Sequence, residues 1–484
     1  MAATFPDSHG WLTLAQAGWG GTTYLTFQLA VFEAVKLVFA AAFGACIGSL
    51  TNVLVYRIPR GLDFVTPTSR CTSCDTPLTW RENVPIFGWL MLRGRCRFCR
   101  SPISPEYVLV ETFVALLWAF TFAALYMGRG NPLGISLHAI QPEWGNNGFA
   151  LTWPLYVLLV LLFSCLTAMT LVDAKTFTIP PVLTNVPTVL GLVAHAGFAV
   201  YVQYWGGGVL AFRAKGWHWA IATPGPHGWA WVGAALGGVL GLLIGNLMLR
   251  FRLLRRSFED YTAWEEQALK DAGAEQASPA APPAGGAEPA PQHKPTSELD
   301  DVHPHLWVQY PHARREVFKE LLFLAPALSL AYLGSWLAVR WAGPFVVTNA
   351  LSGTREFVTH VPLWLDVLSG VLLGYLIGGG VVWLVRIAGT LGFGKEALGL
   401  GDVHMMAAVG ACLGWIDPVL AFFGAAFLGV GWYVLGRVFK GVASKVMPFG
   451  PFLAMGTILV FFTKPLFEHF FAYLMKTGAP VSMP

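Results

Sequence analysis

The sequence is poor in charged residues. Asp, Glu, Lys and Arg make up only 12% of its 484 residues, whereas soluble domains carry about 25%. This shortage excludes an ordinary soluble domain, and the small net charge of +4 gives no indication of nucleic-acid binding. Apolar residues account for 55% of the chain, with 34 Phe and 20 Trp, and the mean hydropathy is +0.56. The composition therefore indicates an integral membrane protein.

The first 36 residues lack the features of a signal peptide. They contain no basic start followed by an apolar run and a small-residue cleavage site, so we expect no cleaved leader there. Apolar runs long enough to cross a bilayer recur along the rest of the chain. Because a lipid-exposed backbone must satisfy its own hydrogen bonds, the predicted fold class is all-α, a polytopic helix bundle. We predict eight to ten spans, at 37–56, 107–127, 154–172, 182–203, 229–249, 320–339, 363–385, 418–436 and 449–471, with a shorter run at 403–415.

Basic residues are unevenly distributed among the predicted loops. The loop 57–106 carries eight arginines and the segment 250–256 carries four more, whereas the loops 128–153 and 204–228 hold one and two basic residues. Since loops rich in Lys and Arg stay in the cytoplasm, we predict that the N-terminus lies outside and that the loop 57–106 is cytoplasmic.

The region 272–301 is rich in Ala, Pro and Glu and has almost no large apolar residue. It cannot bury a core, so we predict a disordered cytoplasmic insertion around it. The predicted organisation is an N-terminal segment 1–36, a first span 37–56, a four-cysteine domain 57–106, membrane helices 107–255, the insertion 256–318 and membrane helices 319–484.

The sequence contains only seven cysteines. Three lie singly in apolar runs, where a cysteine is usually a small packing residue. The other four form two C-x-x-C pairs, Cys71 with Cys74 and Cys96 with Cys99, and this spacing predicts a small cytoplasmic zinc-knuckle domain with a tetrahedral four-cysteine site. Two disulfides are the alternative, which a cytoplasmic location disfavours because thiols stay reduced there. A four-thiolate site has no open coordination position, so the predicted zinc is structural.

Two aspartates lie at the edges of apolar runs, where a carboxylate is costly. Asp173 ends one run, in TLVDAKTFTIPP, and Asp402 begins another, in GLGDVHMM, and both lie on the predicted cytoplasmic side. Two carboxylates brought together share one proton, so that the charged member activates a water and the neutral member polarises a carbonyl, as in aspartic proteases. The alternative is that each aspartate caps a helix or pairs with a neighbouring lysine, Lys175 or Lys395. The residues alone leave both interpretations open.

Four parts of the chain, in order, resemble a known family. The segment GKEALGLGDVHMMAAVGACLGW contains the motif Gly-x-Gly-Asp, formed by Gly399, Gly401 and Asp402. This segment resembles the signature of the type IV prepilin peptidases. The segment LVDAKTFTIP around Asp173 resembles the part of that family that bears its first catalytic aspartate. The N-terminal segments 44–61 and 70–111 and the later MPFGPFLAMG resemble its cytoplasmic domain and the start of its C-terminal helix.

This resemblance implies that Asp173 and Asp402 are catalytic in a multi-pass enzyme of the bacterial inner membrane. Such an enzyme removes a short basic leader from type IV prepilins or pseudopilins at the cytoplasmic membrane face, so its partners are these precursors and membrane lipids. Many members also methylate the new N-terminus with S-adenosylmethionine, and the cysteine domain is associated with that bifunctional form. The alternatives are a peptidase without methylation, or a transporter or scaffold with a zinc module whose aspartates couple to ions.

The sequence departs from the family at two positions near the aspartates. The family commonly has a lysine two residues after the second aspartate, where this chain has His404, and an aspartate after the proline at the first site, where it has Pro181. Histidine changes its charge near neutral pH, so we expect His404 to tune the aspartates if its side chain lies near Asp402. Since two residues turn a helix by about 200°, the alternative is that it faces lipid headgroups or solvent.

Overall fold

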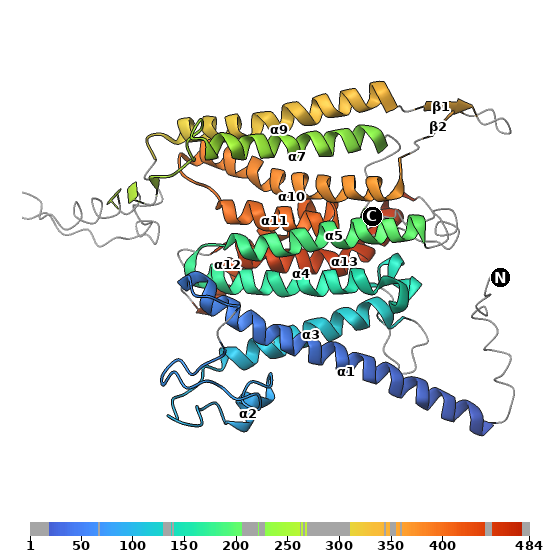
Figure 1. The fold of residues 1–484 in the computed structure, drawn as a ribbon, viewed down its shortest axis with the longest axis vertical. Helices are drawn as coiled ribbons and strands as arrows, with labels where there is room; N and C mark the ends of the chain where they lie inside the picture. Colours follow the sequence, from blue (N-terminus) through green and yellow to red (C-terminus); the bar gives the residue numbers. More distant parts are fainter. Residues whose placement is uncertain are drawn as a thin grey trace, which may run out of the picture. The chain divides into compact units, whose positions relative to one another are not determined.

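The computed structural model describes residues 19–65, 68–128, 137, 140–205, 221, 228–261, 263–264, 267–268, 310–342, 345–348, 355–358, 361–440 and 448–476. Over these residues the chain is mostly helical (Figure 1). Nine of the described helices are long and apolar enough to cross a membrane. They are α1 (Trp19–Arg57), α3 (Glu106–Tyr126), α4 (Phe149–Thr176), α5 (Pro181–Tyr204), α7 (Gly228–Arg250), α9 (Ala313–Ala342), α10 (Leu363–Phe393), α12 (Ile416–Lys440) and α13 (Gly450–Met475). The predicted fold class, an all-α polytopic bundle of eight to ten spans with a small cysteine module, is confirmed.

The remaining elements are short. They are the helices α2 (Phe87–Met91) and α11 (Leu400–Leu413), the 3-10 turns η2 (Ile58–Arg60) and η4 (Glu143–Asn147), and two strands, β1 (Phe345–Thr348) and β2 (Arg355–Val358). The strands pair antiparallel, with Phe345 opposite Val358 and Thr348 opposite Arg355. This hairpin between α9 and α10 is a small addition to the predicted all-α class.

Three predicted boundaries differ from the observed ones. Helix α1 begins at Trp19 instead of residue 37, and the absence of proline between residues 19 and 57 permits this longer helix. Helix α9 begins at Ala313, inside the range 256–318 predicted for the insertion, whose central part 272–301 lies outside the described residues. The run predicted at 403–415 forms α11, and its 14 residues reach only about 21 Å, less than the apolar thickness of a bilayer of about 30 Å.

The chain divides into two compact units. Unit 1 comprises Met1–Gly228, His360–Gly379 and His404–Pro484, and unit 2 comprises Trp229–Thr359 and Gly380–Val403. The division passes through α10 and α11, so Asp173 belongs to unit 1 and Asp402 to unit 2. Each unit is described by itself below.

In unit 1 the short helix α11 lies in the core. The side chains of Met405, Met406 and Val409 are fully buried. Its backbone packs directly against α10, since a Cβ atom on Gly410 would lie 1.9 Å from the carbonyl oxygen of Gly374. A helix too short to span is therefore held inside the protein by close backbone packing, which small residues make possible.

In unit 2 a glycine stripe joins α7 to α9, which lie side by side (Figure 1). The stripe consists of Gly233, Gly237, Gly241 and Gly245, one every four residues, which is one face of a helix. A Cβ atom on Gly237 would lie 2.0 Å from the carbonyl oxygen of Leu330. The two backbones touch here, and any larger side chain would force the helices apart.

A four-cysteine module and two buried aspartates

The four paired cysteines come together in one cluster. Their sulfur atoms all lie within 4.8 Å of one another. The sulfurs of Cys71 and Cys99 are 3.8 Å apart, and those of Cys74 and Cys96 are 4.0 Å apart. Four thiolates at a Zn–S distance of about 2.3 Å in a tetrahedron lie about 3.8 Å apart. The cluster therefore fits a zinc ion, and it joins the two C-x-x-C pairs as the spacing predicts.

The two cysteine turns have the same local structure. Residues 70–77 (RCTSCDTP) and 95–102 (RCRFCRSP) share the pattern R-C-x-x-C-x-S/T-P, and the ends of each form an isolated β-bridge. In each turn the N–H of the first cysteine donates to the carbonyl five residues on, over 3.0 Å. The residue after the second cysteine has a positive φ, 52° for Asp75 and 56° for Arg100. The repeat is visible in the sequence and is a second signal of paired metal-binding turns.

Hydrogen bonds favour the thiolate form of Cys71 and Cys99, whereas burial and the neighbouring sulfurs of Cys99 and Cys71 raise the pKa of Cys96. N–H groups of Ser73 and Cys74 bond to the sulfur of Cys71 and lower the pKa of this thiol to about 6. Hydrogen bonding to Ser101, whose Oγ lies 3.2 Å from the Cys99 sulfur, lowers the pKa of Cys99. Because zinc binds the thiolate form, the surroundings of Cys71 and Cys99 suit them as metal ligands.

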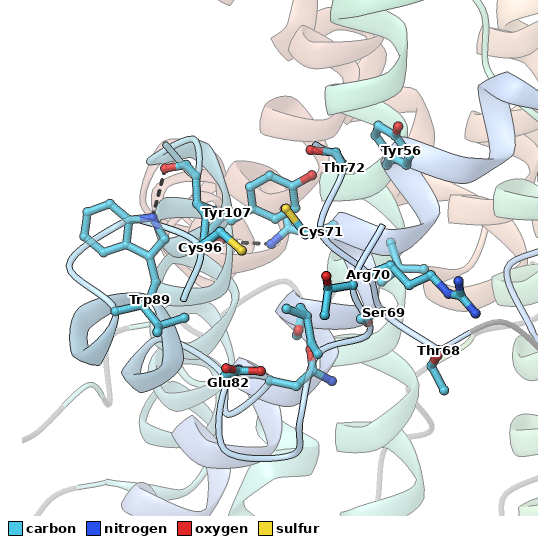
Figure 2. Close-up of a pocket in the computed structure, with 18 of the residues that line it drawn as sticks. Tyr56, Thr68, Ser69, Arg70, Cys71, Thr72, Glu82, Trp89, Cys96 and Tyr107 are labelled. Atoms are coloured by element: carbon cyan, nitrogen blue, oxygen red, sulfur yellow. Dashed lines mark hydrogen bonds between the residues drawn. The ribbon is translucent and has the colours of Figure 1, made fainter. Parts of the chain in front are cut away.

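The cysteine module is anchored to the adjoining helices α1 and α3. The carboxylate of Glu111 in α3 accepts the N–H of Ile86 over 2.6 Å, and Arg57 at the end of α1 donates to the carbonyl of Thr68 over 3.3 Å. Within the module, Trp89 Nε1 donates to the carbonyl of Ile103 over 3.2 Å (Figure 2). The module is therefore fixed to the start of α3 and the end of α1.

A cavity of about 780 Å³ lies beside these anchors, between the cysteine turns and the two helices (Figure 2). Aromatic rings line it, from Tyr56, Trp89 and Tyr107, together with charged side chains that include Arg57 and Glu111. Ligand cavities usually measure about 300–1,000 Å³ and combine apolar walls with a few polar groups. This cavity therefore has the size and lining of a small-molecule site, which the sequence did not predict.

Asp173 lies in the last turn of α4 and is only 6% exposed. Its Oδ2 accepts a hydrogen bond from the N–H of Gly450, the first residue of α13, over 3.1 Å. The positive end of the α13 dipole therefore faces this carboxylate. A Cβ atom on Gly450 would lie 2.6 Å from the same oxygen, so the contact requires glycine. Gly450 lies in the segment MPFGPFLAMG, which the sequence distinguished only by its family resemblance.

Asp402 lies in the first turn of α11 and is 8% exposed. Its N–H donates to the carbonyl of Gly399 over 3.2 Å, which closes the Gly-x-Gly-Asp turn. His404, two residues on, is exposed, as expected from a rotation of about 200° between the two positions. Asp173 and Asp402 belong to different units, so their pairing stays a prediction, as does the tuning role of His404.

Two other charged groups are accounted for by structural pairs. Lys175, considered above as a partner of Asp173, forms an ion pair with Glu106 at the start of α3. Asp417 at the start of α12 pairs with Lys464 over 2.9 Å. Asp417 is therefore explained by a buried ion pair.

Comparisons with known proteins find similarity to the same family. Residues 42–125 match the bacterial peptidase A24 N-terminal domain. Three curated relatives are each named prepilin leader peptidase/N-methyltransferase. The protein of Myxococcus xanthus is 45% identical over 87 residues, 18% of this chain and 26% of the relative. That of Klebsiella pneumoniae is 40% identical over 96 residues, 19% and 41% of the two chains. That of Aeromonas hydrophila is 33% identical over 159 residues, 28% and 49%.

The resemblance to the type IV prepilin peptidase family is thereby confirmed. The matched domain contains all four cysteines and every residue that lines the cavity, whereas Asp173 and Asp402 lie outside it. The alignments span about a quarter to a half of the length of these relatives, and no solved structure matches the chain.

Proposed function

We propose that this protein is an aspartic endopeptidase that removes the leader peptide of type IV prepilins or pseudopilins at the cytoplasmic face of the bacterial inner membrane. The observation that carries the proposal is the similarity to curated relatives named prepilin leader peptidases, at up to 45% identity. The nine membrane-length helices among the described residues support the location, because the substrate carries an apolar helix next to its leader.

The catalytic residues of this proposal are Asp173 and Asp402. In the proposed reaction, the charged carboxylate takes a proton from water while the water oxygen attacks the scissile carbonyl carbon. The neutral carboxyl donates its proton toward the carbonyl oxygen, and collapse of the tetrahedral intermediate releases the leader and a protonated amine. The burial of both side chains at helix ends supports this division of roles, because buried carboxylates near each other do not both stay charged.

The test is co-expression of the full chain with a precursor whose basic leader ends in glycine before an apolar helix. Mass spectrometry of the mature precursor should find the chain shortened at that glycine. An intact precursor, with both proteins inserted in the membrane at normal levels, would refute the peptidase.

We propose N-methylation of the new N-terminus as a second activity. The relatives are named N-methyltransferases as well as peptidases. We propose that S-adenosylmethionine binds in the cavity of the cysteine module. Its rings from Tyr56, Trp89 and Tyr107 suit a planar base and a sulfonium cation, since aromatic faces attract cations. In this proposal zinc, bound by the four cysteines, would fix the two cysteine turns that form one wall of the cavity.

The same spectra test the methylation. A methylated mature N-terminus that disappears in Trp89→Ala, while cleavage remains, would support a donor site in the module. A cleaved but unmethylated product from the wild type would refute the methylation and leave the peptidase activity as the only proposed activity. A transporter or scaffold, the other alternative, predicts no cleavage at all.

A further inference from the structure

A buried arginine lies close to the Gly-x-Gly-Asp turn in unit 2. Arg386 in α10 is completely buried, with 0% of its side chain exposed. A buried guanidinium is costly unless carboxylates and hydrogen bonds satisfy it. The proposed peptide cleavage does not use this residue, so its position requires another explanation.

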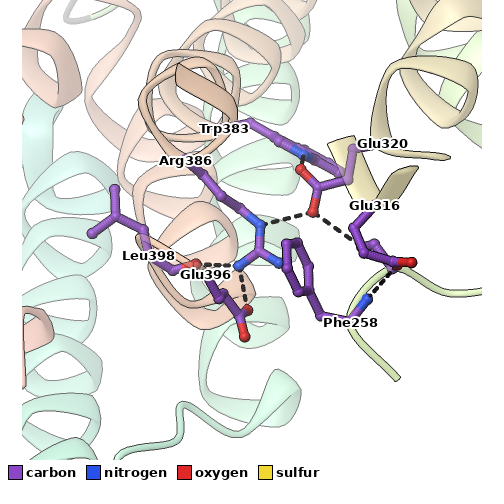
Figure 3. A network of polar contacts seen from close by, with 8 residues as sticks. Phe258, Glu316, Glu320, Trp383, Arg386, Glu396 and Leu398 are labelled. Atoms are coloured by element: carbon purple, nitrogen blue, oxygen red, sulfur yellow. Dashed lines mark hydrogen bonds and ion pairs between the residues drawn. The ribbon is translucent and has the colours of Figure 1, made fainter. Parts of the chain in front are cut away.

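One side of Arg386 holds the connection between α10 and α11. Its Nη1 donates to the carboxylate of Glu396 over 2.6 Å and to the backbone carbonyl of Leu398 (Figure 3). Leu398 directly precedes Gly399, whose carbonyl accepts the N–H of Asp402. Arg386 therefore fixes the chain at the point where it enters the turn that carries Asp402.

The other side of Arg386 holds α9. Its Nε donates to Glu320 over 2.9 Å. The same carboxylate accepts Trp383 Nε1 and the hydroxyl of Ser257, each over 3.0 Å. Ser257 follows α7 closely in the chain, so Glu320 connects Arg386 to the first flank of the predicted insertion.

Both flanks of the insertion reach this network. The ring of Phe258 lies 5.2 Å from the guanidinium of Arg386, whose Nη2 has no hydrogen-bond partner within the described part of the chain. Phe258 packs with Tyr261 and with Tyr310, which lies on the far side of the insertion. The N–H of Tyr310 donates to the carbonyl of Gly394 over 2.7 Å, in the same α10–α11 connection.

We propose that Arg386 is a positioning residue for Asp402, and that through it the two flanks of the insertion hold the Gly-x-Gly-Asp turn in place. The effect on cleavage rests on the proposed peptidase function, whereas the effect on the turn does not. Arg386 acts through Leu398 and Glu396 and does not contact the reacting atoms. A change in the insertion that displaces its flanks would then change the position of a catalytic carboxylate.

The first test measures hydrogen–deuterium exchange in the full-length protein in detergent. Glu396→Gln removes one ion pair from the connection, and Arg386→Lys keeps the charge but loses the planar fork. Amides of 396–402 should exchange about tenfold faster or more in both variants, because a charge-assisted hydrogen bond to a short segment is lost. Helices α9 and α10 should stay protected.

The matched control is Asp417→Asn, which breaks the buried ion pair with Lys464 and leaves residues 396–402 unchanged in sequence. This variant should not speed exchange in 396–402. Unchanged exchange there in both Glu396→Gln and Arg386→Lys would overturn the proposal. An equal rise over all of α9 and α10 would also overturn it, because it would show a general structural role.

The second test separates turnover from substrate binding. With a prepilin precursor as substrate, Glu396→Gln should lower kcat about tenfold while KM stays within about twofold, since the variant displaces a catalytic group and not the substrate site. A change confined to KM would contradict positioning. If the wild type cleaves no precursor, the proposed function fails, and the exchange measurement still decides the role of Arg386.

The third test concerns the flanks. Phe258→Leu removes the aromatic face over Arg386 and keeps an apolar side chain, so exchange in 396–402 should rise about threefold, in line with a partly desolvated cation–π contact. No rise in this variant would overturn the coupling between the insertion and the turn.

Discussion

Asp173 and Asp402 differ from ordinary surface aspartates in their surroundings. Each is a buried carboxylate at a helix end, 6% and 8% exposed. Asp173 accepts a hydrogen bond from the first residue of α13, and Asp402 lies in the first turn of α11. Helix N-termini stabilise negative charge, which offsets part of the cost of burying each carboxylate.

Replacing either aspartate by asparagine should abolish cleavage. Asp173→Asn and Asp402→Asn keep the side-chain shape, so both proteins should insert normally. Loss of either carboxylate removes the acid or the base, which is worth about 10²–10⁴ in rate for each role. The measurement is precursor cleavage at matched expression. The control is Asp366→Asn, in the first turn of α10, which should cleave normally. Normal processing by Asp173→Asn or Asp402→Asn would sink the assignment.

Gly450 should be nearly as sensitive as the aspartate that it contacts. In Gly450→Ala the new Cβ would lie 2.6 Å from Asp173 Oδ2, so either the carboxylate or the start of α13 must move. We expect a destabilisation of about 1–3 kcal/mol from overpacking and a large loss of cleavage. Thermal unfolding and cleavage assays measure the two effects.

The matched control for this variant is Gly424→Ala in α12. A Cβ atom there would meet only Val460, at 3.9 Å, so stability and cleavage should stay close to wild type. Equal activity of Gly450→Ala and Gly424→Ala would show that the contact with Asp173 is unimportant for catalysis.

At the scale of elements, the cysteine module is two copies of one turn whose four sulfur atoms meet in one cluster. Its isolated bridges and the single short helix α2 provide little regular secondary structure to hold it. A bound structural metal contributes its binding free energy directly to folding in such a small unit. The module in turn forms one wall of the cavity beside α1 and α3.

The purified protein should contain about one zinc per chain. Cys71→Ser should lose the metal and make the 57–106 region sensitive to proteases, while cleavage falls only partly because the metal does not contact the scissile bond. Cys46→Ser, which changes a single exposed cysteine of α1, should retain zinc. Metal analysis and limited proteolysis are the measurements. A metal-free wild type with its four thiols oxidised in pairs would show disulfides instead.

At the scale of the whole molecule, the predicted orientation follows from the basic loops. It places the insertion and the ends of the helices that carry Asp173 and Asp402 in the cytoplasm. In the proposed reaction, a leader peptide that has not crossed the membrane reaches the aspartates only from that side, so orientation and substrate access depend on each other.

A protease site inserted after Gly285 tests this orientation. The site should be cut in inside-out membrane vesicles and protected in right-side-out vesicles. A matched site inserted after Gly216, in a loop predicted to lie outside, should show the opposite pattern. Cleavage of the Gly285 site in right-side-out vesicles would contradict the predicted topology.

The sequence by itself determined the class of the protein and its candidate groups. Long apolar runs with few charges specify membrane-length helices, because the bilayer imposes their length. The two C-x-x-C pairs specify a cluster, because four thiolates bind one tetrahedral ion wherever the loop allows it. Composition alone did not distinguish Asp173 and Asp402 from the other aspartates. The resemblance of their motifs to the family did.

Only the tertiary structure decided which groups hold those residues in place. The contact of Gly450 with Asp173 joins positions 277 residues apart, and that of Arg386 with Glu320 joins positions 66 apart. Neither shows a periodic or local signal, since each depends on how separate helices pack. The burial of α11 and the cavity beside the cysteine turns are also results of packing. A sequence encodes local preference and spacing directly, whereas long-range contacts exist only once the helices are assembled.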